Sequence, residues 1–228
     1  MKRETLQNFV HFVLKNFSHT QYLGLENVPT SGGVILATNH LSRLDIPILF
    51  DIPTRRDITA LVADKYKTYP FFRWFCLTAG GIWLDRDKAD FAAFRQAAEA
   101  LAQGRSLGIA PEGTRSDGEL LEGKAGTVLL ALKAGVPVIP VAIYGSEQAV
   151  ADWKHFRKPR MTCSFGKPLN FAPLDRENRD AGLAAYTTEM MCQIAVMLPE
   201  KYRGFYAQHP RNFDRAARNT DQDHARTV

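Results

Sequence analysis

The sequence predicts an α/β fold: a single domain with a central mixed, mostly parallel sheet flanked by helices, preceded by an N-terminal amphipathic helix. Two observations carry this prediction. Short apolar runs, such as residues 34–37 and 107–110, alternate along the chain with segments whose apolar residues recur at helical spacing. The chain has 228 residues, 45% of them hydrophobic and 23% charged, which suits one globular domain able to bury a sizeable core.

The N-terminal helix is predicted from one apolar stripe at helical spacing, formed by Leu6, Phe9, Val10, Val13, Leu14 and Phe17. Such a stripe fits two positions equally well, because it can pack on the core of the domain or lie in a lipid interface. We predict that residues 1–20 form this helix and that residues 21–207 form the main domain. Residues 208–228 are polar with several arginines, which predicts a disordered tail.

In the first half of the main domain, strands are expected at residues 22–26, 34–38 and 58–63, with a turn at 29–33 that contains Pro29, Gly32 and Gly33. Residues 70–75 form an aromatic cluster that opens with Pro70, a residue suited to the first turn of a helix. We expect these aromatic side chains to pack in the core.

The second half continues the alternation. A short strand at 81–84 precedes a helix opened by Asp87 and Asp90 and ended by Gly104, with a buried stripe of Phe91, Phe94, Ala98 and Leu101. A strand at 107–110 and a helix at 125–134 follow. Two prolines mark the strand 136–143 as an edge or irregular strand. A half-exposed strand is then predicted from Met161, Cys163 and Phe165, and a long core helix from Leu183, Tyr186, Met190, Ile194 and Met197.

The segment 39–45, Asn-His-Leu-Ser-Arg-Leu-Asp, follows a predicted buried strand and carries the main candidate for catalysis. Pro47 limits how far the segment can continue as regular structure, so His40 and Asp45 are expected in a strand-to-helix turn. A neutral imidazole takes up a proton near neutral pH, and a carboxylate bonded to its second nitrogen fixes the tautomer. The pair is therefore a candidate general base with its orienting acid, and the alternative is a helix-capping Asp45 beside a surface histidine.

Three further blocks follow in order: Gly-Gly-Ile-Trp-Leu-Asp-Arg at 80–86, Pro-Glu-Gly-Thr-Arg-Ser at 111–116 and Val-Pro-Val-Ile-Pro-Val at 136–141. In content, order and spacing, the four blocks resemble the motifs of the glycerolipid acyltransferase family, whose best-known members are the 1-acylglycerol-3-phosphate acyltransferases. The resemblance runs from about residue 23 to residue 168. It implies that the chain is an enzyme of phospholipid biosynthesis that transfers an acyl group.

The third block has the chemistry of an anion site. A glycine lets a ligand approach the backbone closely, a threonine hydroxyl donates a hydrogen bond, and an arginine fork matches phosphate geometry. The resemblance implies that the acceptor is bound by Arg86, Glu112, Gly113, Thr114 and Arg115, with Asn39 and Lys65 as further substrate-binding residues. Many relatives place a lysine directly after the second strand's Val-Ala, whereas here Asp64 takes that place and Lys65 follows it.

Composition limits the partners and the compartment. The net charge of +5 favours phosphate headgroups or a membrane surface, and no zinc-finger spacing or RNA-binding aromatic block points to nucleic acid. The chain has no apolar run long enough to span a bilayer and no signal-peptide core, so we expect a cytoplasmic protein bound peripherally to the inner face of the cell membrane. Cys76, Cys163 and Cys192 are scattered in apolar surroundings and predict reduced packing cysteines, with no metal site.

The resemblance implies acyl transfer from acyl-CoA or an acyl carrier protein to the free hydroxyl of a lysophospholipid, with no cofactor. The preferred acceptor is 1-acylglycerol 3-phosphate, giving phosphatidate, and glycerol 3-phosphate or another lysolipid is the alternative. In such an enzyme the aromatic cluster 70–75 could also wall an acyl-chain channel. Two other classes compete: a lipid-binding protein without turnover, and a hydrolase using Ser106 of the Gly-Arg-Ser-Leu-Gly sequence at 104–108. A nucleophile elbow needs a strand before the serine and a helix after it, and the order predicted here is the reverse.

Overall fold

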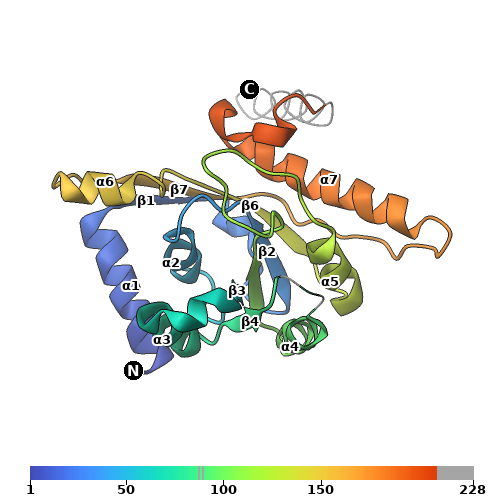
Figure 1. Ribbon diagram of the computed structural model, residues 1–228, viewed down its shortest axis with the longest axis horizontal. Helices are drawn as coiled ribbons and strands as arrows, with labels where there is room; N and C mark the ends of the chain where they lie inside the picture. Colours follow the sequence, from blue (N-terminus) through green and yellow to red (C-terminus); the bar gives the residue numbers. More distant parts are fainter. Residues whose placement is uncertain (87, 89, 210–228) are drawn as a thin grey trace.

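A seven-stranded sheet forms the centre of the molecule (Figure 1). The computed structural model describes residues 1–86, 88 and 90–209. The strands lie side by side in the order β1-β7-β6-β2-β5-β3-β4. Their bounds are β1 His19–Leu23, β2 Val34–Thr38, β3 Thr59–Ala63, β4 Ile82–Leu84, β5 Ser106–Ile109, β6 Val138–Tyr144 and β7 Arg160–Phe165.

Five neighbouring strands run in one direction. The pairs β2–β6, β2–β5, β3–β5 and β3–β4 are all parallel, whereas β6 and β7 are antiparallel and β7 pairs in parallel with β1. The carboxyl ends of β2 to β6 therefore meet at one edge of the sheet. The predicted mixed, mostly parallel sheet is confirmed.

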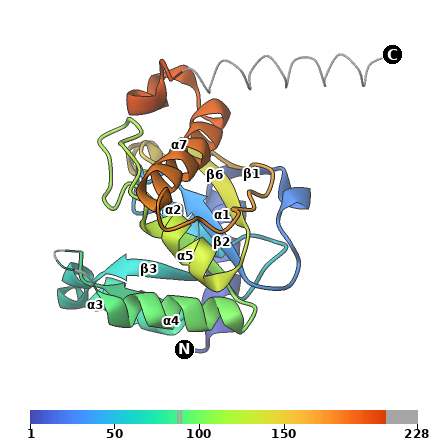
Figure 2. The same cartoon turned by 90° about the vertical axis from the view of Figure 1, so that its right-hand side faces the viewer.

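Helices cover both faces of this sheet (Figures 1 and 2). Their bounds are α1 Arg3–Phe17, α2 Asp45–Phe50, α3 Pro70–Ala79, α4 Phe91–Ala102, α5 Gly126–Ala134, α6 Ala149–Lys154 and α7 Arg179–Met197. One core cluster joins α1, α2 and the end of α3 to one face, and a second joins α4, α5 and α7 to the other. Strand β2 sends Val34 and Leu36 into the first cluster and Ile35 and Ala37 into the second, which is why its sequence is a continuous apolar run.

Strand β6 lies inside the sheet, so of the two predicted alternatives the edge strand is wrong and the irregular strand is confirmed. Pro140 is tolerated there because a bulge accompanies it. Val138 pairs with Leu169 and Val141 with Phe165. Two residues of β6, 139 and 140, therefore lie opposite three residues, 166–168, of the segment that follows β7. The carbonyl of Pro140 accepts the N–H of Gly166 at 2.8 Å, so the missing proline N–H falls at the irregular step.

Two smaller predictions also need correction. Strand β1 covers His19–Leu23 rather than 22–26, because Gly24 adopts a left-handed conformation (φ 73°) that ends the strand. Helix α4 is capped by Asp90, whose side chain accepts the N–H of Ala93, and Asp87 lies outside the described residues. Its buried face consists of Ala93, Ala97, Ala100 and Leu101, while Phe91 at the first helical position is 81% exposed.

Helix α1 divides the predicted apolar stripe between the core and the surface. Leu6, Val10 and Leu14 are buried against the sheet. Phe9 and Phe17 are more than half exposed, as is Phe12, which the stripe did not include. The helix thus packs on the core through one side, while the aromatic part of the predicted stripe faces solvent.

Other predictions can be placed briefly. Cys163 and Cys192 are buried in the two core clusters and Cys76 is buried at the end of α3, as expected for packing cysteines. Within the described residues, no helix combines the length and the apolar character needed to cross a membrane. Of the predicted tail, residues 210–228 lie outside the described part of the chain.

Candidate active site

The turn between β2 and α2 brings His40 and Asp45 together. His40 Nδ1 lies 2.9 Å from Asp45 Oδ2, and the same oxygen accepts the backbone N–H groups of Leu41 and Ser42, each at 2.8 Å. These bonds close the turn around the carboxylate, so two side chains five positions apart can meet. The imidazole is 12% exposed and the carboxylate 2% exposed.

The second oxygen of Asp45 is held from a distant strand. The hydroxyl of Ser146, directly beyond the end of β6, donates to Asp45 Oδ1, and Ser146 is completely buried. The carboxylate therefore has donors on both oxygens, which fixes its orientation toward His40. We had not predicted this residue from the sequence, although Ser146 follows the strand that contains the fourth motif.

Asn39 and Glu112 have positions that differ from the substrate contacts predicted for them. The Asn39 side chain is 1% exposed; it donates to the carbonyl of Ile143 and accepts its N–H, both at 2.8 Å, and so extends the pairing of β2 with β6. Glu112 is 2% exposed and accepts the N–H groups of His40 and Leu121, at 2.9 and 2.8 Å. Both side chains hold the loops around His40 in place from inside the protein.

Burial raises the pKa of Glu112 to about 7, and the charge of Asp45 acts in the same direction. The two backbone N–H donors lower it and offset only part of this effect. A group with such a pKa changes charge near neutral pH, and it does so while bonded directly to the backbone of the catalytic candidate.

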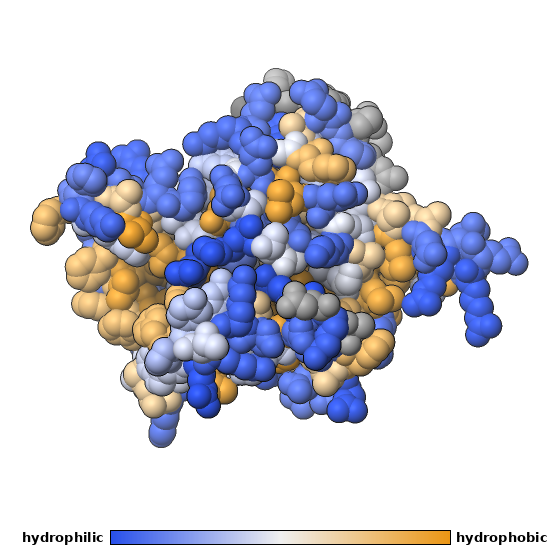
Figure 3. All heavy atoms as spheres, in the orientation of Figure 1, coloured by the Kyte–Doolittle hydropathy of each residue, from blue (hydrophilic) through white to orange (hydrophobic). Residues whose placement is uncertain are grey.

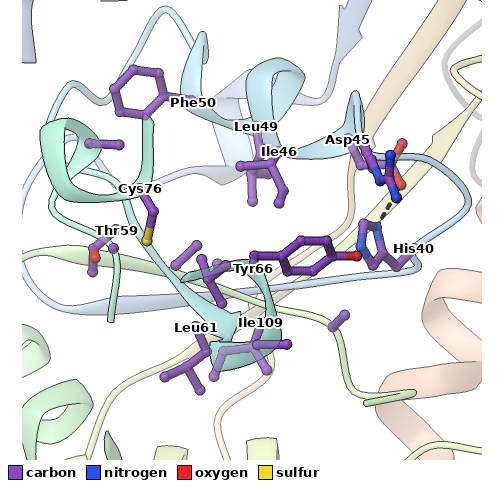
Figure 4. Close-up of a pocket in the computed structure, with 18 of the residues that line it drawn as sticks. His40, Asp45, Ile46, Leu49, Phe50, Thr59, Leu61, Tyr66, Cys76 and Ile109 are labelled. Atoms are coloured by element: carbon purple, nitrogen blue, oxygen red, sulfur yellow. Dashed lines mark hydrogen bonds and ion pairs between the residues drawn. The ribbon is translucent and has the colours of Figure 1, made fainter. Parts of the chain in front are cut away.

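An apolar pocket extends from His40 into the domain, between α2 and α3 on one side and β3 and β5 on the other (Figure 4). Its cavity has a volume of about 100 Å³. The walls include Ile46, Leu49, Phe50, Leu61, Phe72, Phe75, Cys76 and Ile109. A methyl group added at Gly108 in this wall would lie 2.6 Å from Leu49 Cδ2, so the glycine keeps the pocket open.

A second, polar pocket of about 160 Å³ opens on the other side of His40. It is lined by Lys65, Arg86, Thr114 and Arg115, so four residues predicted to bind the acceptor are brought together. Tyr66 also lines both pockets, and Figure 4 shows its hydroxyl pointing toward the His40 ring.

Two further residues of the third motif can now be placed. Gly113 has φ 73°, a left-handed conformation that favours glycine, which explains why a glycine stands at this position. A methyl group added there would also lie 3.1 Å from Lys124 Nζ. Ser116 lines the polar pocket, and its buried hydroxyl oxygen has no hydrogen-bond partner within the part of the chain that the structure describes. This hydroxyl therefore lies unpaired in the wall of the pocket, and we had not singled it out from the sequence.

Each of the five parallel strands contributes a residue at its carboxyl end. His40 follows β2, Lys65 follows β3, Arg86 follows β4, Arg115 follows β5 and Ser146 follows β6. In open α/β sheets, ligands bind beyond the carboxyl ends of the strands. Ser106, by contrast, begins β5, is fully buried and lies at the opposite end of that strand, which removes it as a nucleophile.

Comparison with known proteins places this arrangement in a family. A family model described as Acyltransferase matches residues 19–144, which include His40, Asp45, Arg86 and the third motif. The chain belongs to the acyltransferase family. The predicted resemblance is confirmed.

Two of the related proteins come from bacteria. A 1-acyl-sn-glycerol-3-phosphate acyltransferase of Borreliella burgdorferi is 32% identical over 126 residues, which cover 54% of this chain and 50% of the relative. A lyso-ornithine lipid O-acyltransferase of Pseudomonas aeruginosa is 36% identical over 121 residues, covering 52% and 46%. These matches thus span about half the length of the relatives.

The fold of this acyltransferase chain also matches a solved structure. The 1-acyl-sn-glycerophosphate acyltransferase of Thermotoga maritima has 26% sequence identity and a TM-score of 0.61, with 82% of this chain and 80% of that chain covered. The structural match therefore extends over most of both proteins, beyond the segment covered by the family model.

Proposed function

We propose that the protein transfers an acyl group from a thioester donor to the free hydroxyl of a lysophospholipid. The observation that carries this proposal is the position of His40, which lines both the apolar pocket and the basic pocket. A base between a site for an acyl chain and a site for an anionic headgroup matches the two halves of this reaction.

In the proposed step, His40 Nε2 takes the proton of the acceptor hydroxyl as its oxygen attacks the thioester carbonyl carbon. The carbon–oxygen ester bond forms, the carbon–sulfur bond breaks, and the imidazolium returns the proton to the thiolate that leaves. Asp45, bonded to Nδ1, keeps Nε2 unprotonated before the reaction and stabilises the imidazolium during it. No covalent enzyme intermediate is needed, because a thioester is already activated.

The acyl chain is assigned to the apolar pocket and the acceptor's phosphate to the polar one. A guanidinium fork suits a phosphate, and Arg86, Arg115 and Lys65 supply three cations beside His40. This grouping favours 1-acylglycerol 3-phosphate as the acceptor, with phosphatidate as the product. Glycerol 3-phosphate carries the same group, and another lysolipid is the further alternative. The donor is acyl-CoA or acyl carrier protein, and no cofactor takes part.

We also propose that the enzyme works at a membrane surface, bound peripherally at the inner, cytoplasmic face. Transfer of a lysolipid from the bilayer to water costs about 0.8 kcal/mol of free energy per CH₂. An enzyme docked on the membrane surface therefore has an advantage over one in solution. Three aromatic side chains of α1 support this proposal, because Phe9, Phe12 and Phe17 are 53–59% exposed. The net charge of +5 adds attraction to anionic lipid.

The test is an assay of the purified protein with radiolabelled acyl-CoA or acyl carrier protein and a panel of acceptors. The panel contains 1-acylglycerol 3-phosphate, glycerol 3-phosphate and an uncharged monoacylglycerol. We expect labelled phosphatidate as the main product. Free fatty acid without ester product would indicate a hydrolase, and binding without turnover would indicate a lipid-binding protein; either result would refute the proposal.

A further inference from the structure

Phe156, at the tip of the connection between β6 and β7, combines two unusual features. Its side chain is 100% exposed, and its backbone is left-handed with φ 56°. Among the described residues it is the one non-glycine residue with positive φ. Bulky side chains rarely adopt this conformation, and such strain persists where a function uses it.

The turn that carries Phe156 is well bonded. The N–H of Phe156 donates to the carbonyl of Trp153 at 3.0 Å, and the N–H of Arg157 donates to the carbonyl of Asp152 at 2.9 Å. The Arg157 guanidinium also lies 3.4 Å from the Asp152 carboxylate. The ring is thus held out into solvent by a defined turn, and the exposure does not come from a loose loop.

Cationic side chains flank Phe156 in the sequence. Lys154, Arg157 and Lys158 are all exposed within two residues of it. An aromatic ring among exposed cations matches the interface of an anionic bilayer, where the ring enters the headgroup layer and the cations meet lipid phosphates. An acidic protein surface would use the cations but would bury the ring only if it offered an apolar pocket.

The turn is joined to the exposed aromatic face of α1. The indole N–H of Trp153 in α6 donates to the carbonyl of Phe17 at 2.7 Å, so the end of α1 and the end of α6 are fixed to each other. Figure 1 shows α6 beside the C-terminal end of α1, and Figure 3 shows apolar surface over α1 with hydrophilic side chains at the tip of α6.

We propose that Phe156 and its flanking cations form a second membrane contact, which inserts one ring into anionic lipid and sets the orientation of the domain together with α1. The proposal deepens the proposed function, because it rests on an acceptor that resides in a bilayer. A contact beyond the end of α1 fixes the rotation about the helix axis, which a single helix leaves free. The partner that this contact binds is an anionic lipid surface.

The decisive variant is Phe156→Gly. Glycine adopts positive φ without steric cost, so the variant should have a melting temperature equal to or above that of the wild type. Loss of a ring that becomes buried on docking should weaken binding to mixed phosphatidylcholine and phosphatidylglycerol vesicles about tenfold or more. A loss of binding with no loss of stability separates a docking role from a structural one.

A charge variant and a matched control complete the test. Lys154→Gln with Lys158→Gln should weaken binding to the mixed vesicles about tenfold and leave binding to pure phosphatidylcholine vesicles unchanged. Phe91→Ala removes another exposed ring, 81% exposed, on α4, which lies on the other side of the molecule from α6 in Figure 1, and should bind as the wild type does.

Vesicle flotation of the full chain measures lipid binding directly and does not depend on acyl transfer. The proposal is overturned if Phe156→Gly binds vesicles as the wild type does, or if Phe156→Gly and Phe91→Ala lose vesicle binding equally. The first result would favour an acidic protein, in place of a membrane, as the partner of the turn around Phe156. Acyl transfer to acceptor in detergent micelles, which need no docked orientation, is measured separately and should be unchanged in Phe156→Gly. If the wild type transfers no acyl group in micelles, the proposed function fails while the flotation result still stands.

Discussion

Replacement of Asp45 by asparagine tests the proposed base most directly. The substitution preserves the shape of the side chain and an oxygen that can accept the His40 Nδ1–H, but it removes the negative charge. For His40, the charge matters most when the imidazole becomes positive, which is during acyl transfer. The variant should therefore bind both substrates and react slowly.

The size of the effect follows from the geometry. The histidine nitrogen and the carboxylate oxygen are 2.9 Å apart, and both side chains are nearly enclosed. Unit charges about 4 Å apart interact by about 4 kcal/mol at an effective dielectric constant of about 20. Since about 1.4 kcal/mol corresponds to tenfold in rate, we expect kcat to fall about 10³-fold. For His40→Ala we expect a decrease in kcat of about 10²–10⁴-fold, the range typical of general-base loss.

The assay is steady-state release of the thiol from an acyl-CoA donor, with the acceptor in micelles. Asp51→Asn is the matched control, because Asp51 also pairs with a histidine, His11, at 3.1 Å, and neither residue lines the apolar or the polar pocket. It should leave kcat unchanged. If Asp45→Asn folds as judged by its melting temperature and retains kcat within tenfold of the wild type, the assignment of His40 and Asp45 is refuted.

Four other predictions follow from the site and the surface. Arg115→Lys keeps the charge and loses the bidentate fork, so the acceptor KM should rise while the donor KM stays constant. Gly108→Ala crowds the apolar pocket and should reduce the ratio of long-chain to short-chain transfer, measured with paired acyl-CoA donors. Glu112 binds its proton more tightly in the folded protein, since its pKa is raised from 4.5 to about 7, so the unfolding free energy should fall by up to about 3 kcal/mol as pH rises through that window. Denaturant unfolding of wild type and Glu112→Gln across that pH range checks this, and an equal slope in both would contradict it. Phe9→Glu combined with Phe17→Glu should lower vesicle binding without unfolding the chain, because both rings are exposed, and unchanged flotation would exclude α1 as a contact.

The local parts of the site were predictable because the sequence encodes them locally. A buried strand followed by a short turn lets His40 and Asp45 meet, and the other three motifs favoured this pairing over a capping Asp45 beside a surface histidine. The grouping of Lys65, Arg86 and Arg115 was implied by the family resemblance, and the fold explains it: each follows a strand, and parallel strands end at the same edge.

The missing parts depend on contacts between distant residues. Ser146 reaches Asp45 across 101 positions, and Asn39 pairs with Ile143 across 104 positions. Periodicity and motif spacing say nothing about which strands become neighbours, so the inward role of Asn39 was hidden. The position of β6 was left open for the same reason, since Pro140 fits an edge strand and an irregular strand equally well until the bulge opposite it is known.

The second histidine–aspartate pair shows what makes His40 a candidate base. His11 is bonded to Asp51 at a similar distance, but its side chain is 55% exposed, and an exposed ion pair contributes at most about 1 kcal/mol. Asp45 differs because it is more fully enclosed and accepts two backbone N–H groups and the hydroxyl of the buried Ser146, and His40 differs because it lines two pockets of opposite character. The same two residue types therefore form a surface contact in one place and a candidate base in the other. Enclosure strengthens the electrostatic interaction, and the two pockets define which molecules can reach it.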